Sequence, residues 1–259
     1  LDGEKAVLPV AKKLWERFLQ LADAKFPQLR TIRADFRDVR TPSLLRRLGE
    51  FDLVLCSNVL NELGLSMGTK RKSLFEEVLE KNVAASGTLL LIEPALLKTS
   101  KDLTFFRDDF LRGRDIHTPI PCGHSGTCPL NLEPRDWCHF DVEWSPPPIR
   151  YKLEKALDHQ TGLPKYSYLV FRHGKAETSG DRYRVLSDPL LTKSDHLLLL
   201  CSPSQKVTVR FNPKNKPMLT SVRRGDILQM ELPVTEAKPA GHGYGIEVDA
   251  ASIRKIEKI

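Results

Sequence analysis

Hydrophobic residues recur along the first 175 positions with helical and strand spacings in alternation. A helix is predicted over residues 5–23, where apolar side chains fall on one stripe, namely Val7, Leu8, Ala11, Leu14, Trp15, Phe18 and Ala22. Two more helices are predicted over 70–82 and 101–112, the second with Ser100 as its N-cap. Strands are predicted at the apolar runs LRTIRAD, FDLVLCSN and GTLLLIEP, and YSYLVFR (166–172) is expected to close the same sheet.

The segment FDLVLCSN is apolar along most of its length, which is typical of a parallel strand covered on both faces. Cys56 alternates there with core leucine and valine, so we interpret it as a small core residue. Helices and strands in alternation indicate an α/β fold with a doubly wound sheet. Ligands of such sheets bind at the carboxyl ends of the strands, here Asp35–Phe36, Ser57–Asn58 and Glu93–Pro94.

The pattern changes after residue 175. Five short β-like runs follow, separated by Pro, Gly, Ser, Asp and Lys: RVLSDPL, HLLLLC, KVTVRFN, GDILQMEL and GIEVD. They predict a small antiparallel barrel or sandwich, and five strands would suit an OB-like barrel. The sequence therefore predicts two domains, 1–175 and a β-rich module over 176–259.

The formal net charge of +7 and the pI near 9.1 favour an anionic partner such as nucleic acid, although a generally basic surface explains the charge equally well. Each basic run is interleaved with acidic residues, which is typical of a solvated surface. No apolar stretch reaches the length of a membrane helix, so no membrane partner is expected. Five cysteines argue against a disulfide framework.

Three cysteines are concentrated in TPIPCGHSGTCPLNLEPRDWCHF. Cys122, Cys128 and Cys138 are separated by five and nine residues, so they can reach one metal centre. Cys201, at the end of DHLLLLC, is the first candidate for a fourth ligand, and His124 and His139 compete with it. Inert buried thiols are the structural alternative. The spacing matches no zinc knuckle, which favours a 4Fe–4S cluster over zinc.

Acidic and polar residues at the strand ends predict a nucleotide-type cofactor site. Asp2 could accept hydrogen bonds from ribose hydroxyls, and Asp35 with Phe36 could lie beside an adenine. Ser57 and Asn58 follow the next strand. Helix capping by Asp2 and a turn role for Asp35 are equally good interpretations. No Ser-His-Asp spacing or HExxH motif is found, so the sequence supports no hydrolase and identifies no catalytic residue.

Two boxes in the cysteine-rich stretch resemble those of a methyltransferase-like family associated with the small ribosomal subunit in mitochondria and many bacteria. That family carries P-C-P-H-x3-C-P-[LM] and W-C-H-F. Here the boxes read PCGHSGTCPL, from Pro121 to Leu130 with Gly123 in place of proline, and WCHF, from Trp137 to Phe140. FDLVLCSNVLNEL and LLLIEPA resemble the family's fourth and fifth strands. The resemblance covers 1–175 clearly and 176–259 loosely.

The resemblance implies a class I S-adenosylmethionine methyltransferase-like (Rossmann-type) domain with a cluster-binding insertion over 114–145. It also implies a 4Fe–4S cluster on four cysteines, with Cys201 matching the last. The implied partners are small-subunit rRNA and ribosomal proteins, in the mitochondrial matrix or the bacterial cytoplasm. The implied role is in assembly or translation competence of the small subunit.

The family's glycine-rich cofactor loop would precede Asp2 and is not in this sequence, so methyl transfer is left open. Two alternatives accompany the assembly role. One is an active S-adenosylmethionine-dependent rRNA methyltransferase that uses Asp2, Asp35 and Asn58. The other is a zinc-stapled RNA-binding module. Because Cys201 belongs to the second domain, a bound metal centre would staple the two domains together.

Overall fold

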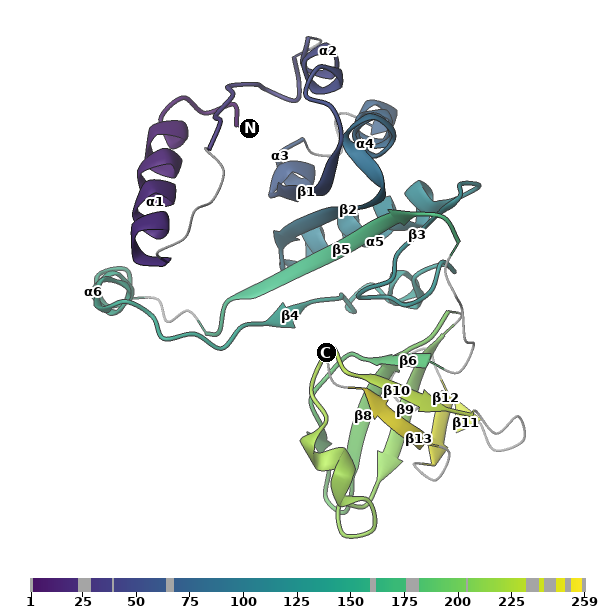
Figure 1. Cartoon of the computed structure of the whole chain (residues 1–259). Coiled ribbons are helices and arrows are strands. Elements are labelled where there is room, and N and C mark those ends of the chain that lie inside the picture. Colours follow the sequence, from purple (N-terminus) through teal and green to yellow (C-terminus); the bar gives the residue numbers. More distant parts are fainter. Residues whose placement is uncertain are drawn as a thin grey trace.

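The computed structural model describes residues 2–22, 29–38, 40–63, 68–158, 162–175, 182–203, 205–231, 238–239, 246–249 and 253–257 (Figure 1). The first sheet and its helices comprise α1 (Val7–Ala22), α2 (Thr41–Arg46), β1 (Phe51–Ser57), α3 (Val59–Leu63), α4 (Gly68–Asn82), β2 (Val83–Pro94), α5 (Leu97–Leu111), β3 (Ile116–His117), the 3-10 turn η2 (Pro129–Leu132), β4 (Phe140–Asp141), α6 (Pro148–Ala156) and β5 (Lys165–His173). The second sheet comprises β6 (Arg182–Val185), β7 (Leu190–Leu191), β8 (His196–Cys201), β9 (Lys206–Phe211), η3 (Pro217–Ser221), β10 (Ile227–Met230), β11 (Lys238–Pro239), β12 (Ile246–Asp249) and β13 (Ile253–Glu257).

The first sheet has the order β1-β2-β5-β3, with β4 also paired to β5. β1 and β2 are parallel, whereas β5 runs antiparallel to β2, as a strand that closes the sheet. The chain is therefore a mixed α/β protein, as its pattern predicts. The expected strand LRTIRAD is reduced to an isolated parallel bridge between Asp2 and Arg33. Among the described residues, the rest of the segment pairs with no strand.

The second sheet has the order β11-β12-β9-β8-β6-β10-β13, with β7 paired to β8. Its pairs are antiparallel except for β12 and β9. Alternating side chains build a core of its own, which includes Val185, Leu198, Leu200, Val207, Val209 and Leu228. The predicted β-rich texture is thus present. The predicted boundary at residue 175 adjoins residues 176–181, which lie outside the described residues.

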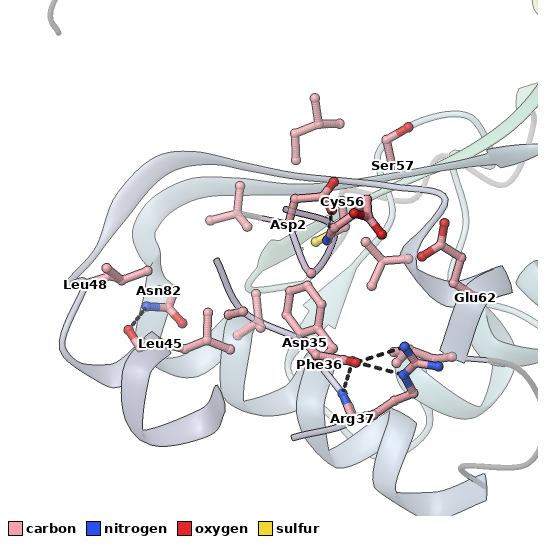
Figure 2. A pocket seen from close by; sticks show the side chains of 18 of the residues that line it. Asp2, Asp35, Phe36, Arg37, Leu45, Leu48, Cys56, Ser57, Glu62 and Asn82 are labelled. Atoms are coloured by element: carbon pink, nitrogen blue, oxygen red, sulfur yellow. Dashed lines mark hydrogen bonds and ion pairs between the residues drawn. The ribbon is translucent and has the colours of Figure 1, made fainter. Parts of the chain in front are cut away.

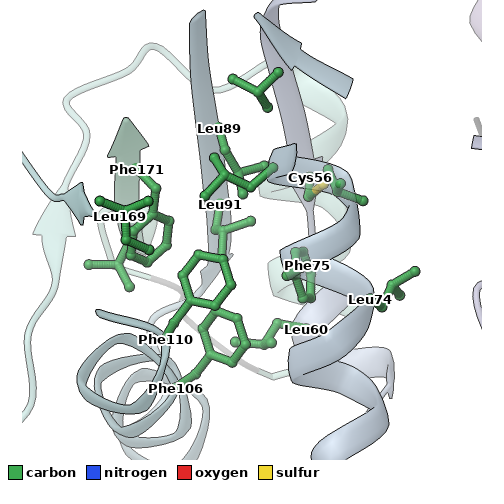
Figure 3. Packing of buried hydrophobic residues seen from close by; sticks show 14 of the residues in the cluster. Cys56, Leu60, Leu74, Phe75, Leu89, Leu91, Phe106, Phe110, Leu169 and Phe171 are labelled. Carbon is green, nitrogen blue, oxygen red and sulfur yellow. The ribbon is translucent and has the colours of Figure 1, made fainter. Parts of the chain in front are cut away.

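The core of the first sheet lies on the face covered by α3, α4 and α5 (Figure 3). Phe106 and Phe110 of α5 stack with ring centroids 5.1 Å apart, and Phe110 meets Phe171 of β5 edge-on at 4.9 Å. Phe75 of α4 packs against Phe106 at 5.3 Å. Cys56 is buried in this core, as predicted. Burial of these aromatic rings is what fixes α5 against the sheet.

The packing departs from the sequence pattern in two places. The apolar stripe of α1 is largely exposed, including Val7, Leu14 and Phe18, and β1 leaves Leu53 and Leu55 more than half exposed on the face away from α4. α1 lies apart from β1 (Figure 1). Hydrophobic periodicity predicts a helix but does not predict which element it packs against.

Ser100 is not the N-cap of α5, which begins at Leu97. It lies buried inside the helix, where its Oγ is 2.8 Å from the Oγ of Ser167. No helix among the described residues is long and apolar enough to cross a membrane.

Candidate functional site

One stripe of α5 holds the cysteine-rich loop in place. Lys101 donates to the backbone carbonyls of Leu130 and Glu133, and Thr104 donates to the side chain of Asn131 at 2.6 Å. These positions are three to four residues apart and share a helix face. The loop is therefore positioned by the helix whose opposite side is anchored in the aromatic core.

Asp108 and Arg107 continue this stripe. The carboxylate of Asp108 accepts the backbone N–H of Cys128 at 3.0 Å and the side-chain amide of Asn131 at 2.9 Å. The guanidinium of Arg107 is fully buried and donates to the carbonyls of His124 and Gly126, and to Asp108 at 2.6 Å. Burial opposes the charge of Arg107, but the thiols of Cys122 and Cys128 and the carboxylate of Asp108 outweigh it and raise its pKa. The backbone around the first two cysteines is thus fixed by buried charged side chains.

Cys122, Cys128, Cys138 and Cys201 all line one small, enclosed cavity. The first three come from the loop between α5 and β5, and Cys201 ends β8 of the second sheet. The loop cysteines are held by backbone contacts, such as the 2.6 Å bond from Ser167 Oγ of β5 to the carbonyl of Cys138. The structure therefore brings together the four cysteines that the sequence singled out, and none of them forms a disulfide.

The buried thiols of the cavity are hard to ionise on their own. Burial, with the nearby thiols of Cys122 and Cys138, raises the pKa of Cys128 to about 12. Burial and the neighbouring cysteines raise the pKa of Cys201 well above its usual value. A cation that bound here would therefore displace protons from the sulfurs, because thiolates are the ligating form.

The competing histidines are not among the residues that line this cavity. His124 is buried, its Nε2 lies 3.9 Å from Cys201 Sγ, and its Nδ1 lies 3.3 Å from Arg107. Burial and the charge of Arg107 lower its pKa to about 3, so the ring is neutral. His139 points instead toward Arg224, which contacts its Nε2. This arrangement favours Cys201 as the fourth sulfur.

The cavity also has a cationic wall that sequence reasoning missed. Arg184 of β6 is 3% exposed, lines the cavity, and donates from Nη1 to Cys138 Sγ at 2.8 Å. The basic residues of the chain were interpreted as solvated surface, and RYRV carries no signal that this arginine points inward. Three consecutive buried residues in a strand, Tyr183 to Val185, arise here because both faces of β6 are covered.

Three further contacts join the cysteine loop to the second sheet. Lys206 of β9 pairs with Asp136, with Nζ and Oδ2 2.5 Å apart. Arg224 contacts His139 and lies 3.5 Å from the carboxylate of Asp141. At Gly126 a Cβ atom would lie 2.6 Å from the carbonyl oxygen of Pro203, so only glycine allows this approach.

The cysteine side chains suit a thiolate-bound group in kind and number, since four sulfurs surround one cavity beside buried cations. Across the described part of the chain, no group of three or more His, Cys, Asp or Glu side chains is already arranged to hold a metal ion. Ligand sets of this kind close around their group when it binds.

A second, open cavity of about 1010 Å³ lies at the carboxyl end of β1 (Figure 2). Asp2, Asp35, Phe36 and Ser57 all line it, so four of the five predicted cofactor residues are brought together. Asn58 follows β1 in a left-handed conformation, with φ of 60°, and is not among the lining residues. The volume is that of a site for a drug-sized ligand.

The two acids of this cavity already have local partners. Asp2 Oδ1 accepts the backbone N–H of Glu4 at 2.7 Å. Asp35 accepts two side-chain bonds from Arg37, at 3.0 and 2.8 Å, and also its backbone N–H. Hydrogen bonding from Arg37 lowers the pKa of Asp35. Asp35 thus makes the turn contact that was its structural alternative, whereas Asp2 binds Glu4 and does not cap α1, which begins at Val7. Both residues line the cavity (Figure 2).

The fold and the enclosed site define a mixed α/β protein whose two sheets meet at a cysteine-lined cavity. The chain matches the model of the family described as mitochondrial small ribosomal subunit Rsm22 over residues 9–230, and it belongs to that family. The match includes all four cavity cysteines. It confirms the family that the two cysteine boxes indicated, and it relates the function to the small ribosomal subunit. The comparison with curated proteins gives no match.

Proposed function

We propose that this protein is an assembly or translation factor of the small ribosomal subunit, which binds rRNA through a methyltransferase-like domain stapled to its β-rich module by a 4Fe–4S cluster. The observation that carries the proposal is the meeting of Cys122, Cys128 and Cys138 with Cys201 around one cavity between the two sheets. The parallel pair β1–β2 with an antiparallel closing strand supports the methyltransferase-like, Rossmann-type assignment. We further propose that the second sheet has an OB-like arrangement.

The cluster would act as a structural clamp. When bound, it would supply four iron–thiolate bonds in place of four thiol groups, of which those of Cys128 and Cys201 are buried. The three loop cysteines are attached to α5 and β5, whereas Cys201 is attached to β8. Ligation of all four would therefore make the placement of the β-rich module depend on the metal group.

The metal test uses the full chain purified without oxygen, as wild type, as Cys201→Ser and as Cys56→Ser. We expect a brown wild type with about four irons and four sulfides per chain, and a colourless Cys201→Ser protein. Cys56 is equally buried but lies in the core of the first sheet, so Cys56→Ser should keep its colour. One zinc per chain in a colourless wild type would support the zinc-stapled module instead.

The RNA test measures binding to small ribosomal subunits. The net charge of +7 and the family membership support contacts with rRNA and with ribosomal proteins. Cosedimentation with small subunits should weaken steeply as salt is raised, because phosphate contacts release counterions. Binding that does not respond to salt, or no binding, would contradict the rRNA part of the proposal. The family description supports the mitochondrial matrix over a bacterial cytoplasm as the location.

The open cavity supports one alternative function, an S-adenosylmethionine-dependent rRNA methyltransferase. Its supporting observation is the convergence of Asp2, Asp35, Phe36 and Ser57 on one cavity. Calorimetric titration with S-adenosylmethionine tests it, with Phe36→Ala as the variant that removes the aromatic ring. Saturable binding that Phe36→Ala weakens would favour the methyltransferase. Absence of binding would exclude it and leave the assembly role as the proposed function.

A further inference from the structure

Two buried arginines flank the cysteine-lined cavity, and they differ in how their N–H groups are used. Arg107 gives its two terminal nitrogens to the carbonyls of Gly126 and His124 and to Asp108. Arg184 gives only Nη1, to Cys138 Sγ, while its Nε and Nη2 have no hydrogen-bond partner among the described residues. The Nε of Arg107 also has no partner among the described residues, but both of its terminal nitrogens hold the loop, whereas Arg184 retains a terminal nitrogen as well as Nε that no described residue uses.

The sheet register directs Arg184 to the site. Arg184 of β6 lies directly opposite Cys201 of β8 in an antiparallel pair. Residues opposite one another in such a pair project to the same face of the sheet. The guanidinium thus lies on the face that carries the Cys201 sulfur, and both residues line the cavity.

The position of the guanidinium is fixed from a second side. Its Cζ lies 4.1 Å from the centre of the ring of Phe140, which begins β4 two residues after Cys138. Gly225, at φ of 101°, lies close enough to that ring that a Cβ would be 3.1 Å from it. Arg184 therefore has little freedom to swing away from the cysteines, because side chains from both sheets enclose it.

Charge balance explains why a buried arginine belongs here. Four thiolates carry a charge of −4, so a Zn²⁺ ion or a 4Fe–4S core of charge +2 leaves the complex at −2. Burying such an anion is costly unless cations and N–H donors compensate it. Arg184 is buried, lines the cavity and donates to the Cys138 sulfur, so its guanidinium is placed to supply this compensation.

We infer that Arg184 is a positioning residue for the metal group: it holds the Cys138 sulfur through Nη1 and offers Nε and Nη2 to the sulfur atoms of a buried, anionic, thiolate-ligated centre. This inference rests on the proposed metal site. It adds that the β-rich module contributes a charge-compensating donor as well as the fourth cysteine. The electronic properties of the centre then depend on the docking of the module.

The test compares full-length wild type, Arg184→Gln, Arg184→Lys and the control Arg182→Gln, all purified without oxygen. Arg182 lies two residues earlier on β6 but pairs with Glu257, away from the cavity. Hydrogen bonds and positive charge at cluster sulfurs favour the reduced, more negative state. In a dithionite titration, Arg184→Gln should lower the reduced-to-oxidised ratio at the wild-type midpoint about tenfold, which is 59 mV for one electron. Arg182→Gln should titrate like wild type.

If the wild type binds the metal group and the metal-loaded Arg184→Gln has the same midpoint potential, the inference is wrong and the proposed function still stands. A wild type without any metal would overturn both. If Arg184→Gln does not fold, Arg184→Lys decides, because it keeps the charge but loses the planar fork, and we expect about a threefold shift. If the metal is zinc, the readout is its loss to a chelator, which should be about tenfold faster in Arg184→Gln, and equal rates would overturn the inference.

Discussion

The two cavities differ in how much of their chemistry is already arranged. The cysteine-lined cavity is enclosed, and a helix, a strand and the second sheet hold its residues with buried partners. The open cavity at β1 gathers the predicted polar residues, but Asp2 and Asp35 are engaged by neighbours two positions away in the chain. Local pairing of this kind forms in many turns, whereas convergence of four cysteines from two sheets does not arise from turn chemistry.

Long-range support therefore identifies a site better than its lining residues alone. Asp108 reaches across twenty residues to Cys128, and Lys206 reaches across seventy to Asp136. Among the described residues, the side chain of Asp35 bonds only to Arg37, at the surface. We therefore expect substitutions at the two cavities to have unequal effects.

The largest expected effect is at Asp108. Asp108→Ala removes the acceptor for Cys128 N–H and leaves the buried Arg107 without its carboxylate, and breaking a buried pair costs about 3–5 kcal/mol. Urea unfolding measures the loss. The matched control is Asp109→Ala at the next position, whose exposed pair with Lys72 is worth about 0–1 kcal/mol. Equal losses in the two variants would show that Asp108 gives the cysteine loop no special support.

Gly126→Ala tests the contact between the loop and the β-rich module. The added Cβ would lie 2.6 Å from the carbonyl of Pro203, so the loop or the module must shift, at a cost of about 1–3 kcal/mol. Limited proteolysis should show new cleavage between about 172 and 195. Gly162→Ala, which meets nothing within 4 Å, should leave the wild-type pattern. If the digest of Gly126→Ala is unchanged, the cysteine loop and the β-rich module are not coupled at this contact.

Glu93 lies near the end of β2, where its carboxylate accepts the N–H groups of Leu60 and Asn61 at 2.8 and 3.2 Å. Burial raises its pKa from 4.5 to about 7. The folded state therefore binds more protons than the unfolded state between these values, and stability should fall as pH rises from about 4.5 to 7. Glu93→Gln should flatten this part of the profile in urea unfolding. The exposed Glu62→Gln should keep the wild-type slope, and an identical slope in Glu93→Gln would refute the assignment.

The smallest effect is expected at Asp35. Its pair with Arg37 is exposed on both sides, so Asp35→Asn should leave the free energy of unfolding nearly unchanged. Thermal unfolding of this variant beside Asp108→Ala gives the comparison directly. A loss as large as that of Asp108→Ala would show that the open cavity is as firmly built as the enclosed one.

The sequence predicted most elements of the first sheet because their signals are local. The apolar runs around Cys56 and Leu91 became β1 and β2, and the alternating run around Leu169 became β5. The candidate cysteine ligands could also be predicted from the sequence, because thiols in a polar, proline-rich stretch have few structural roles. Prediction failed for Ser100 and for the partner of α1, since capping and packing depend on neighbours that the pattern does not contain.

By itself, the sequence determined the mixed α/β class, the β-rich texture after residue 175, the family, and the cysteines that could form one site. The meeting of Cys201 with the loop cysteines, and the position of Arg184 beside them, became visible only in the folded chain. The physical reason is distance along the chain. Periodicity and residue chemistry are local properties, whereas burial of a charge beside a particular sulfur depends on the sheet register that brings distant residues together.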